Sequence, residues 1–73
     1  MSLATMPVAT PCRVSSVRGD DQLSCRLMEM GLIDGAEVEV VGHAPMGDPL
    51  HIRVGDYRLS LRREHAALVD VAR

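Results

Sequence analysis

Three short segments from the middle of the chain onward alternate apolar and polar side chains, and this pattern restricts the fold more than any other feature. They cover residues 36–41, 50–54 and 57–61. Successive side chains of a strand point to opposite faces of a sheet, so each segment is expected to be a strand with one buried face. Gly55-Asp56 separates the last two segments. It is a two-residue hairpin signal, which predicts that these two strands pair.

Weaker signals on either side predict two more strands. Residues 12–18 are rich in β-branched side chains and end at Gly19, and residues 68–71 form a short, mostly apolar run. Residues 62–67 suit a single helical turn before the last strand. The chain is therefore expected to contain five short strands.

A helix is predicted between the first and second strands. Asp20 and Asp21 mark its start, because a carboxylate there accepts a hydrogen bond from a free backbone N–H and complements the helix dipole. Gly31 marks its end, since glycine readily adopts the left-handed conformation that terminates helices. Three apolar side chains share one face of this helix and are expected in the core: Leu23, Leu27 and Met30.

The length of 73 residues leaves room for one domain. Five strands this short cover a core only if the sheet curls onto itself. We therefore expect a mainly β fold, a small five-stranded barrel over residues 12–73 with one end plugged by the short α-helix. Residues 1–11 contain two prolines and no periodicity. They are expected to form an extended lead-in, with residues 1–3 a leader that takes no part in the fold.

The composition argues against several classes of function. The formal net charge is −2 and there is neither Phe nor Trp, so the chain lacks the positive field and the stacking side chains with which proteins bind nucleic acids. No segment approaches the ~20 apolar residues of a membrane span, so no membrane insertion is expected. Cys12 and Cys25 form no CxxC pair and no signal peptide is recognisable, which predicts a cytoplasmic protein with reduced thiols.

The reactive side chains show no catalytic spacing. A nucleophile needs a base within hydrogen-bond reach, but Cys25 lies on the predicted helix and the three His lie in three different segments. A half-buried structural thiol is the simpler interpretation of Cys25. The chain is therefore not expected to be an enzyme or to require a cofactor.

Two histidines and a carboxylate are the candidate metal ligands. His43 and His51 are expected on the outer side of a hairpin, near each other at the base of the loop that contains Asp48. These ligand types suit zinc, so the three side chains can hold adventitious zinc or another divalent transition metal, which two copies of the chain can share. Solvated surface histidines are the alternative interpretation.

The loop of residues 43–49 also predicts a surface for a protein partner. Methionine adapts to irregular partners, and the loop prolines limit the conformational freedom lost on binding. The candidate partner-binding residues are Leu32, Ile33, Met46, Arg58 and Arg62. The alternatives are that Met46 folds back into the core and that the arginines are simply solvated.

Four segments in this order resemble the FeoA family: Arg26 to Leu32, Asp34-Gly35, Ala44 to Pro49, and Leu59 to Arg62. The resemblance covers residues 14–71. It implies an SH3-like barrel that acts as a non-enzymatic accessory protein of bacterial ferrous iron transport. It also implies docking onto the cytosolic GTP-binding region of the FeoB membrane transporter, without catalysis.

Two other functions and the oligomeric state stay open at this point. A metal-sensing SH3-like barrel would bind a transition metal through His43 and His51. A nucleic-acid-binding barrel would retard RNA or DNA at low salt, where backbone-driven binding is strongest. A weak or metal-bridged homodimer is compatible with either metal binding or docking.

Overall fold

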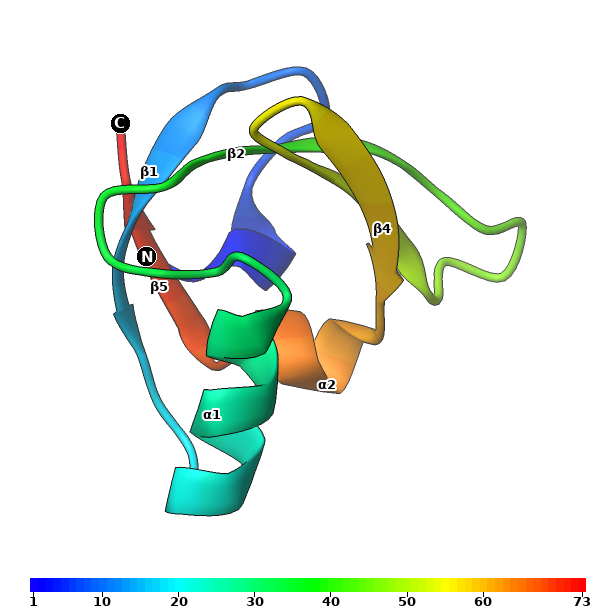
Figure 1. Ribbon diagram of the computed structural model, residues 1–73. Coiled ribbons are helices and arrows are strands. Elements are labelled where there is room, and N and C mark those ends of the chain that lie inside the picture. Colours follow the sequence, from blue (N-terminus) through cyan, green and yellow to red (C-terminus); the bar gives the residue numbers. More distant parts are fainter.

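The computed structural model describes residues 1–73 and contains one antiparallel sheet of five strands, confirming the predicted mainly β barrel (Figure 1). The order across the sheet is β4-β3-β2-β1-β5. The strands are β1 (Cys12–Val17), β2 (Glu37–His43), β3 (Leu50–Val54), β4 (Tyr57–Leu61) and β5 (Val69–Ala72). Their alternation places apolar side chains inside the curled sheet, and all 15 buried residues are hydrophobic.

Two β-bulges interrupt the strand alternation. One lies in β1 between Val14 and Ser16, and the other lies in β2 between Val40 and Gly42. A bulge adds one residue to one strand, so the side chains beyond it exchange faces. In β2 this exchange pairs Gly42 with His51 and pairs His43 with the buried Leu50.

The predicted helix is α1 (Asp21–Glu29), and both of its ends are capped by the expected residues. The Asp20 carboxylate accepts a hydrogen bond of 2.8 Å from the Leu23 N–H. At the other end Gly31 has a φ of +98°. There the Leu32 N–H donates to the carbonyl of Leu27 at 3.2 Å, the long hydrogen bond of a Schellman motif.

This motif corrects the prediction for Met30. Leu27 is buried and Leu23 is partly buried, as expected, but Met30 is the C-cap residue and its side chain is 40% exposed. The Schellman turn instead brings Leu32 against the last turn of the helix, where it is fully buried. Leu32 therefore takes the core position that the helical spacing assigned to Met30.

The amino-terminal segment also differs from the prediction, because it is part of the fold. A 3₁₀-helix, η1 (Leu3–Thr5), replaces the expected extended lead-in, and Leu3 is fully buried. The Met1 carbonyl accepts a hydrogen bond of 2.8 Å from Val71 in β5, and the Ala9 N–H donates to Val40 in β2 at 2.8 Å. Residues 1–3 therefore take part in the fold, contrary to the expectation, since the core includes Leu3.

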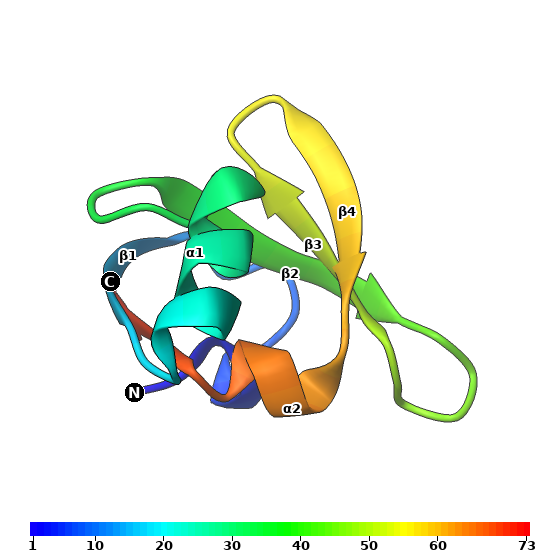
Figure 2. The ribbon, with the colours of Figure 1, turned by 60° about the horizontal axis from the view of Figure 1, so that its bottom comes forward.

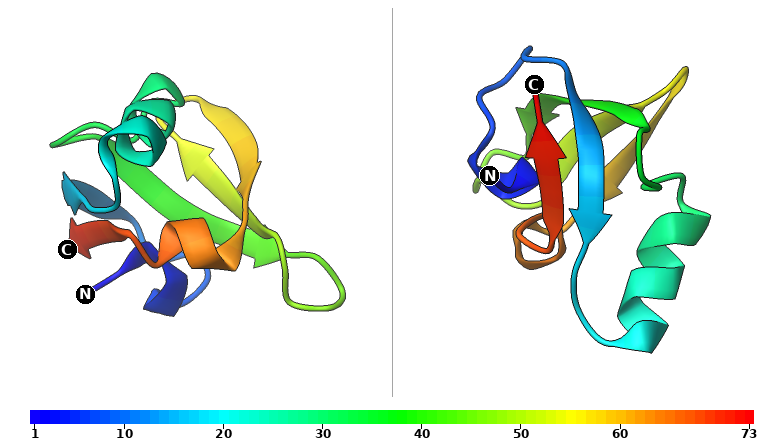
Figure 3. Two further views of the ribbon diagram at one scale, coloured as in Figure 1. Left: turned by 90° about the horizontal axis from the view of Figure 1, so that it is seen from below. Right: turned by 90° about the vertical axis from the view of Figure 1, so that its left-hand side faces the viewer.

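Three helical elements pack against the curled sheet, with η1 beside α2 (Figures 2 and 3). They are α1, η1 and α2 (Arg63–Ala66), which connects β4 to β5. Each contributes a buried side chain: Leu27, Leu3 and Ala66. The barrel is thus plugged by three elements rather than by α1 alone. The chain contains no helix of the length and apolarity needed to cross a lipid bilayer.

Candidate docking surface

The most prominent feature of the surface is the β2–β3 loop (residues 44–49), which projects from the barrel (Figures 1 and 2). The Ala44 N–H donates to the Pro49 carbonyl at 3.0 Å, and the Gly47 N–H donates to the Ala44 carbonyl at 2.7 Å. These bonds close a tight turn with Met46 at its tip, and the Met46 side chain is 93% exposed. The alternative that Met46 folds back into the core is therefore wrong.

Arg63, the first residue of α2, holds the base of this loop. Its Nε donates to the Gly47 carbonyl at 3.0 Å, and its backbone N–H donates to the Asp48 carboxylate at 2.9 Å. Contacts from a second element restrict the loop before any partner binds. The conformational entropy lost on binding through Met46 is correspondingly smaller.

Two arginines that lie opposite each other on β3 and β4, Arg53 and Arg58, differ in their charge partners. Arg53 donates to the carboxylates of Glu37 and Glu39, at 3.0 and 2.9 Å. These bonds, the one to Glu39 foremost, raise the pKa of Arg53 above its ordinary value, so it stays charged. Arg58 lies directly opposite Arg53 on β4 and forms no ion pair, and neither does Arg62. Two of the exposed arginines without an ion pair therefore lie on β4 and just beyond its end.

A shallow groove of about 340 Å³ lies beside this charge on the outer face. We define the outer groove by its lining residues: Val41, Gly42, His51, Arg58, Leu59 and Ser60. It forms at the β2 bulge, where Gly42 contributes no side chain next to His51. Within the groove, Ser60 Oγ lies 3.4 Å from His51 Nδ1, at the long limit of a hydrogen bond. No further side chain forms a hydrogen bond with this imidazole to orient it as a base, so the pair lacks the third group of a catalytic arrangement.

Of the two predicted partner-binding residues that follow α1, only Ile33 is exposed. Leu32 is fully buried, so its assignment to a partner-binding surface is wrong, whereas Ile33 is 52% exposed. Tyr57, the first residue of β4, is 47% exposed, and its hydroxyl donates to the carbonyl of Met30. The exposed apolar side chains at this end of the molecule are therefore Met30, Ile33 and Tyr57.

The three candidate metal ligands are not brought together. Because of the β2 bulge, His43 shares its register position with inward-facing Leu50, and His51 lies on the outer face. His43 Nδ1 lies 2.9 Å from the Ala44 carbonyl, while the Asp48 carboxylate caps Arg63. The chain has no group of three His, Cys, Asp or Glu side chains that could hold a metal. The predicted three-ligand set within one chain is therefore wrong.

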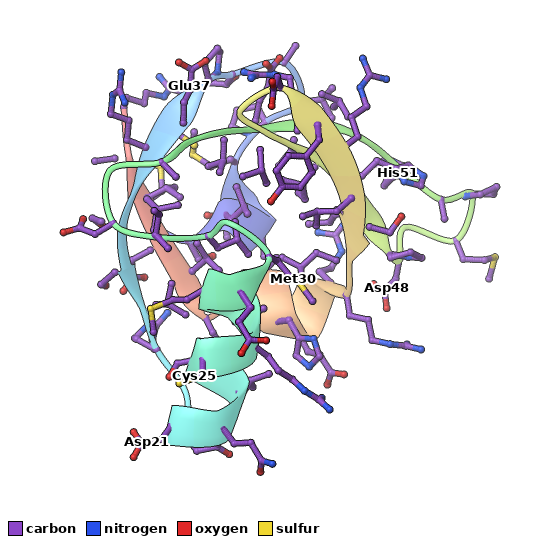
Figure 4. The ribbon with its side chains drawn as sticks, viewed as in Figure 1. Asp21, Cys25, Met30, Glu37, Asp48 and His51 are labelled. Atoms are coloured by element: carbon purple, nitrogen blue, oxygen red, sulfur yellow. The ribbon has the colours of Figure 1, made fainter.

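Neither thiol forms a hydrogen bond with a histidine; the Cys12 thiol donates to the Val38 carbonyl at 3.5 Å. Cys25 is exposed in the middle of α1, at the opposite side of the molecule from His51 (Figure 4). Cys12 is buried in β1, and burial, the largest effect, raises the pKa of its thiol. Neither cysteine has the environment of an activated nucleophile.

The family described as FeoA domain matches residues 1–73. The chain belongs to the FeoA family. A curated relative in Porphyromonas gingivalis, named Fe(2+) transport protein A/Fe(2+) transporter FeoB fusion protein, is 37% identical over 71 residues. The match covers 97% of this chain and 8% of that much longer protein.

Solved FeoA structures have the same fold. Iron(II) transport protein A from Clostridium thermocellum has a TM-score of 0.90 and 32% identity, over 97% of this chain and 44% of that one. FeoA of Stenotrophomonas maltophilia, described as an SH3 domain protein complexed with zinc, has a TM-score of 0.85 and 37% identity. That match covers 99% of this chain and 89% of the other. The predictions of the FeoA family, of an SH3-like barrel and of a non-enzymatic accessory domain are confirmed.

The roles of Gly42 and Arg63 in shaping this surface were not predicted from the sequence. A glycine inside a strand pattern is a known signal for a bulge, so Gly42 could have been recognised. Arg63 had no such signal, because its contact with the β2–β3 loop joins residues 15 and 16 positions apart.

Proposed function

We propose that this FeoA-family chain is a non-enzymatic accessory protein of bacterial ferrous iron uptake that acts in the cytoplasm by docking onto the cytosolic GTP-binding region of FeoB. The observation that carries the proposal is the Porphyromonas gingivalis relative, in which the FeoA and FeoB parts form one chain. A covalent tether raises the effective concentration of a weak docking partner, so such a fusion supports an interaction between the two parts.

The geometry of the β2–β3 loop supports this proposal. Met46 is almost fully exposed at the tip of a loop that Arg63 holds in position. Full burial of a methionine side chain is worth about 1.5–3 kcal/mol. The unpaired charges of Arg58 and Arg62 add a cationic component, which contributes to orientation and association rate.

Calorimetric titration with the cytosolic region of FeoB from the same organism tests the proposal. We expect binding, and we expect Met46→Ser to weaken it at least about tenfold, because burial of the methionine is lost. Met28→Ser is the matched control, since Met28 is a half-exposed methionine on α1 and not on the loop. Absence of binding by the unmodified chain, or equal loss in both variants, would contradict the docking proposal.

A metal-sensing barrel is the second candidate, and the zinc complex of the Stenotrophomonas maltophilia relative favours it. In this chain His43 lies opposite the inward-facing Leu50, whereas His51 lies on the outer face of the sheet. A complete zinc site would therefore need ligands from a second copy of the chain. The expected result is a zinc-dependent dimer that both His43→Ala and His51→Ala abolish, measured by sedimentation velocity. Zinc that leaves the chain monomeric would eliminate a shared-metal dimer.

A further inference from the structure

One of the two outer edges of the sheet is already covered by the chain itself. Beyond β5, Ser2 forms a bridge with Asp70, and the Val71 N–H donates to the Met1 carbonyl at 2.8 Å. No strand follows β4 in the sheet order, and its outer edge is visible in Figure 2. The edge of β4 is therefore the position at which the sheet can be extended.

The hairpin geometry determines which backbone groups of β4 face outward. Val54 and Tyr57 flank a two-residue turn, so they exchange the hydrogen bonds that close the hairpin. Hydrogen-bonded and non-hydrogen-bonded pairs alternate along an antiparallel ladder. Arg58 and Ser60 consequently point their N–H and C=O groups away from β3. Neither residue contributes to the backbone hydrogen bonds outside the helices and strands.

The positive charge at this edge favours the addition of an acidic strand. Arg58 and Arg62 form no ion pair, whereas the neighbouring Arg53 is paired with the carboxylates of Glu37 and Glu39. A second copy of β4 in antiparallel pairing would bring arginines of two chains together, and like charges on paired strands are destabilising. A strand that carries carboxylates would meet opposite charge at the same positions.

We propose that an extended acidic segment of the protein partner adds to residues 58–60 of β4 as a sixth strand. The inference rests on the proposed docking function and specifies its contact. Main-chain hydrogen bonds to Arg58 and Ser60 hold the segment, a carboxylate lies opposite Arg58, and the outer groove accommodates an adjacent side chain. The specificity of such edge pairing depends on the charge pattern of the added segment and not on one fixed amino-acid sequence.

Amide hydrogen exchange tests this contact directly in the unmodified chain. Without partner, the Arg58 and Ser60 amides are expected to exchange rapidly, because they lack acceptors. With the cytosolic region of FeoB in excess, we expect both to slow at least about tenfold, as hydrogen-bonded amides do. If FeoB binds and these two amides are unchanged, docking stands and the sixth-strand contact is overturned.

A pair of substitutions at Ser60 separates the backbone contact from the side chain. Ser60→Pro removes an N–H that the β3 ladder does not use, and proline is tolerated on edge strands. We expect it to weaken FeoB binding at least about fivefold, the effect of about one lost hydrogen bond plus obstruction by the ring. Ser60→Ala keeps the N–H and is expected to bind within about twofold of the unmodified chain. Equal affinities for the two variants, with unchanged thermal unfolding, would overturn the proposal.

Two short synthetic peptides test the edge independently of FeoB. One alternates threonine with glutamate, and the other alternates threonine with lysine. Only the acidic peptide, and not the basic one, is expected to protect the Arg58 and Ser60 amides from hydrogen exchange. If it does so while FeoB fails to bind, the docking proposal fails and the edge inference stands. No protection by either peptide, protection by both, or protection that rises with chain concentration alone would overturn the acidic-segment assignment.

Discussion

Replacement of Leu3 by alanine is expected to lower the free energy of unfolding by about 2–5 kcal/mol. Leu3 is fully buried, and its 3₁₀-helix packs beside α2 and β5. The substitution removes three side-chain carbon atoms and leaves a cavity that a small barrel closes only in part. A domain of this size has a total stability of about 5 kcal/mol, so the variant is expected to be largely or partly unfolded at 37 °C.

Chemical denaturation followed by circular dichroism measures this effect. Val8→Ala is the matched control, because Val8 lies in the same segment and is 51% exposed. Surface substitutions of this kind usually change stability by no more than about 0.5 kcal/mol. Equal stability of the Leu3 and Val8 variants would contradict the assignment of the first residues to the core.

Gly31→Ala is expected to lower the free energy of unfolding by about 1–3 kcal/mol. Gly31 has a φ of +98°, a conformation in which an alanine is strained. The added methyl group would also lie 3.2 Å from Val54 Cγ1 and collide with the Tyr57 hydroxyl, which bonds the Met30 carbonyl. The Schellman end of α1, and with it the burial of Leu32, depends on this residue.

Two other glycines separate the causes of that loss in the same denaturation experiment. Gly35 has a φ of +86° and no atom near an added Cβ, so Gly35→Ala reports backbone strain alone. Gly42 has no positive φ, and an added Cβ would lie 3.9 Å from His51, so Gly42→Ala is expected to be nearly neutral. The expected order of destabilisation is Gly31, then Gly35, then Gly42. A neutral Gly31 variant would contradict the proposed helix end.

Local patterns in the sequence were sufficient to predict the five strands, α1 and the helical turn of α2. The alternation around Val38, Ile52 and Leu61 fixes which side chains are buried, because the period of a strand is two residues. Asp20 and Gly31 predicted the helix ends because capping depends on a few adjacent residues. These signals are short-range, so a single sequence contains them in full.

The incorrect predictions concern residues whose positions depend on contacts between distant segments or on the pairing register of the strands. Leu3 is buried only because residues 1–5 reach α2 and β5, and nothing in the local sequence indicates that contact. The β2 bulge exchanged the faces beyond Val40 and separated His43 from His51. Of the predicted partner-binding residues, Met46, Arg58 and Arg62 are exposed, since loops and outward strand positions are visible in the pattern, whereas Leu32 is drawn inward by the Schellman turn.

The most direct test of docking is an NMR titration of the isotope-labelled chain with the unlabelled cytosolic region of FeoB. We expect chemical-shift changes at the β2–β3 loop and along β4, centred on Met46 and Arg58. The start of α1 around Asp21 and Cys25 lies on the other side of the molecule and should be unaffected (Figure 4). A spectrum unchanged by FeoB, or changes confined to the start of α1, would contradict it.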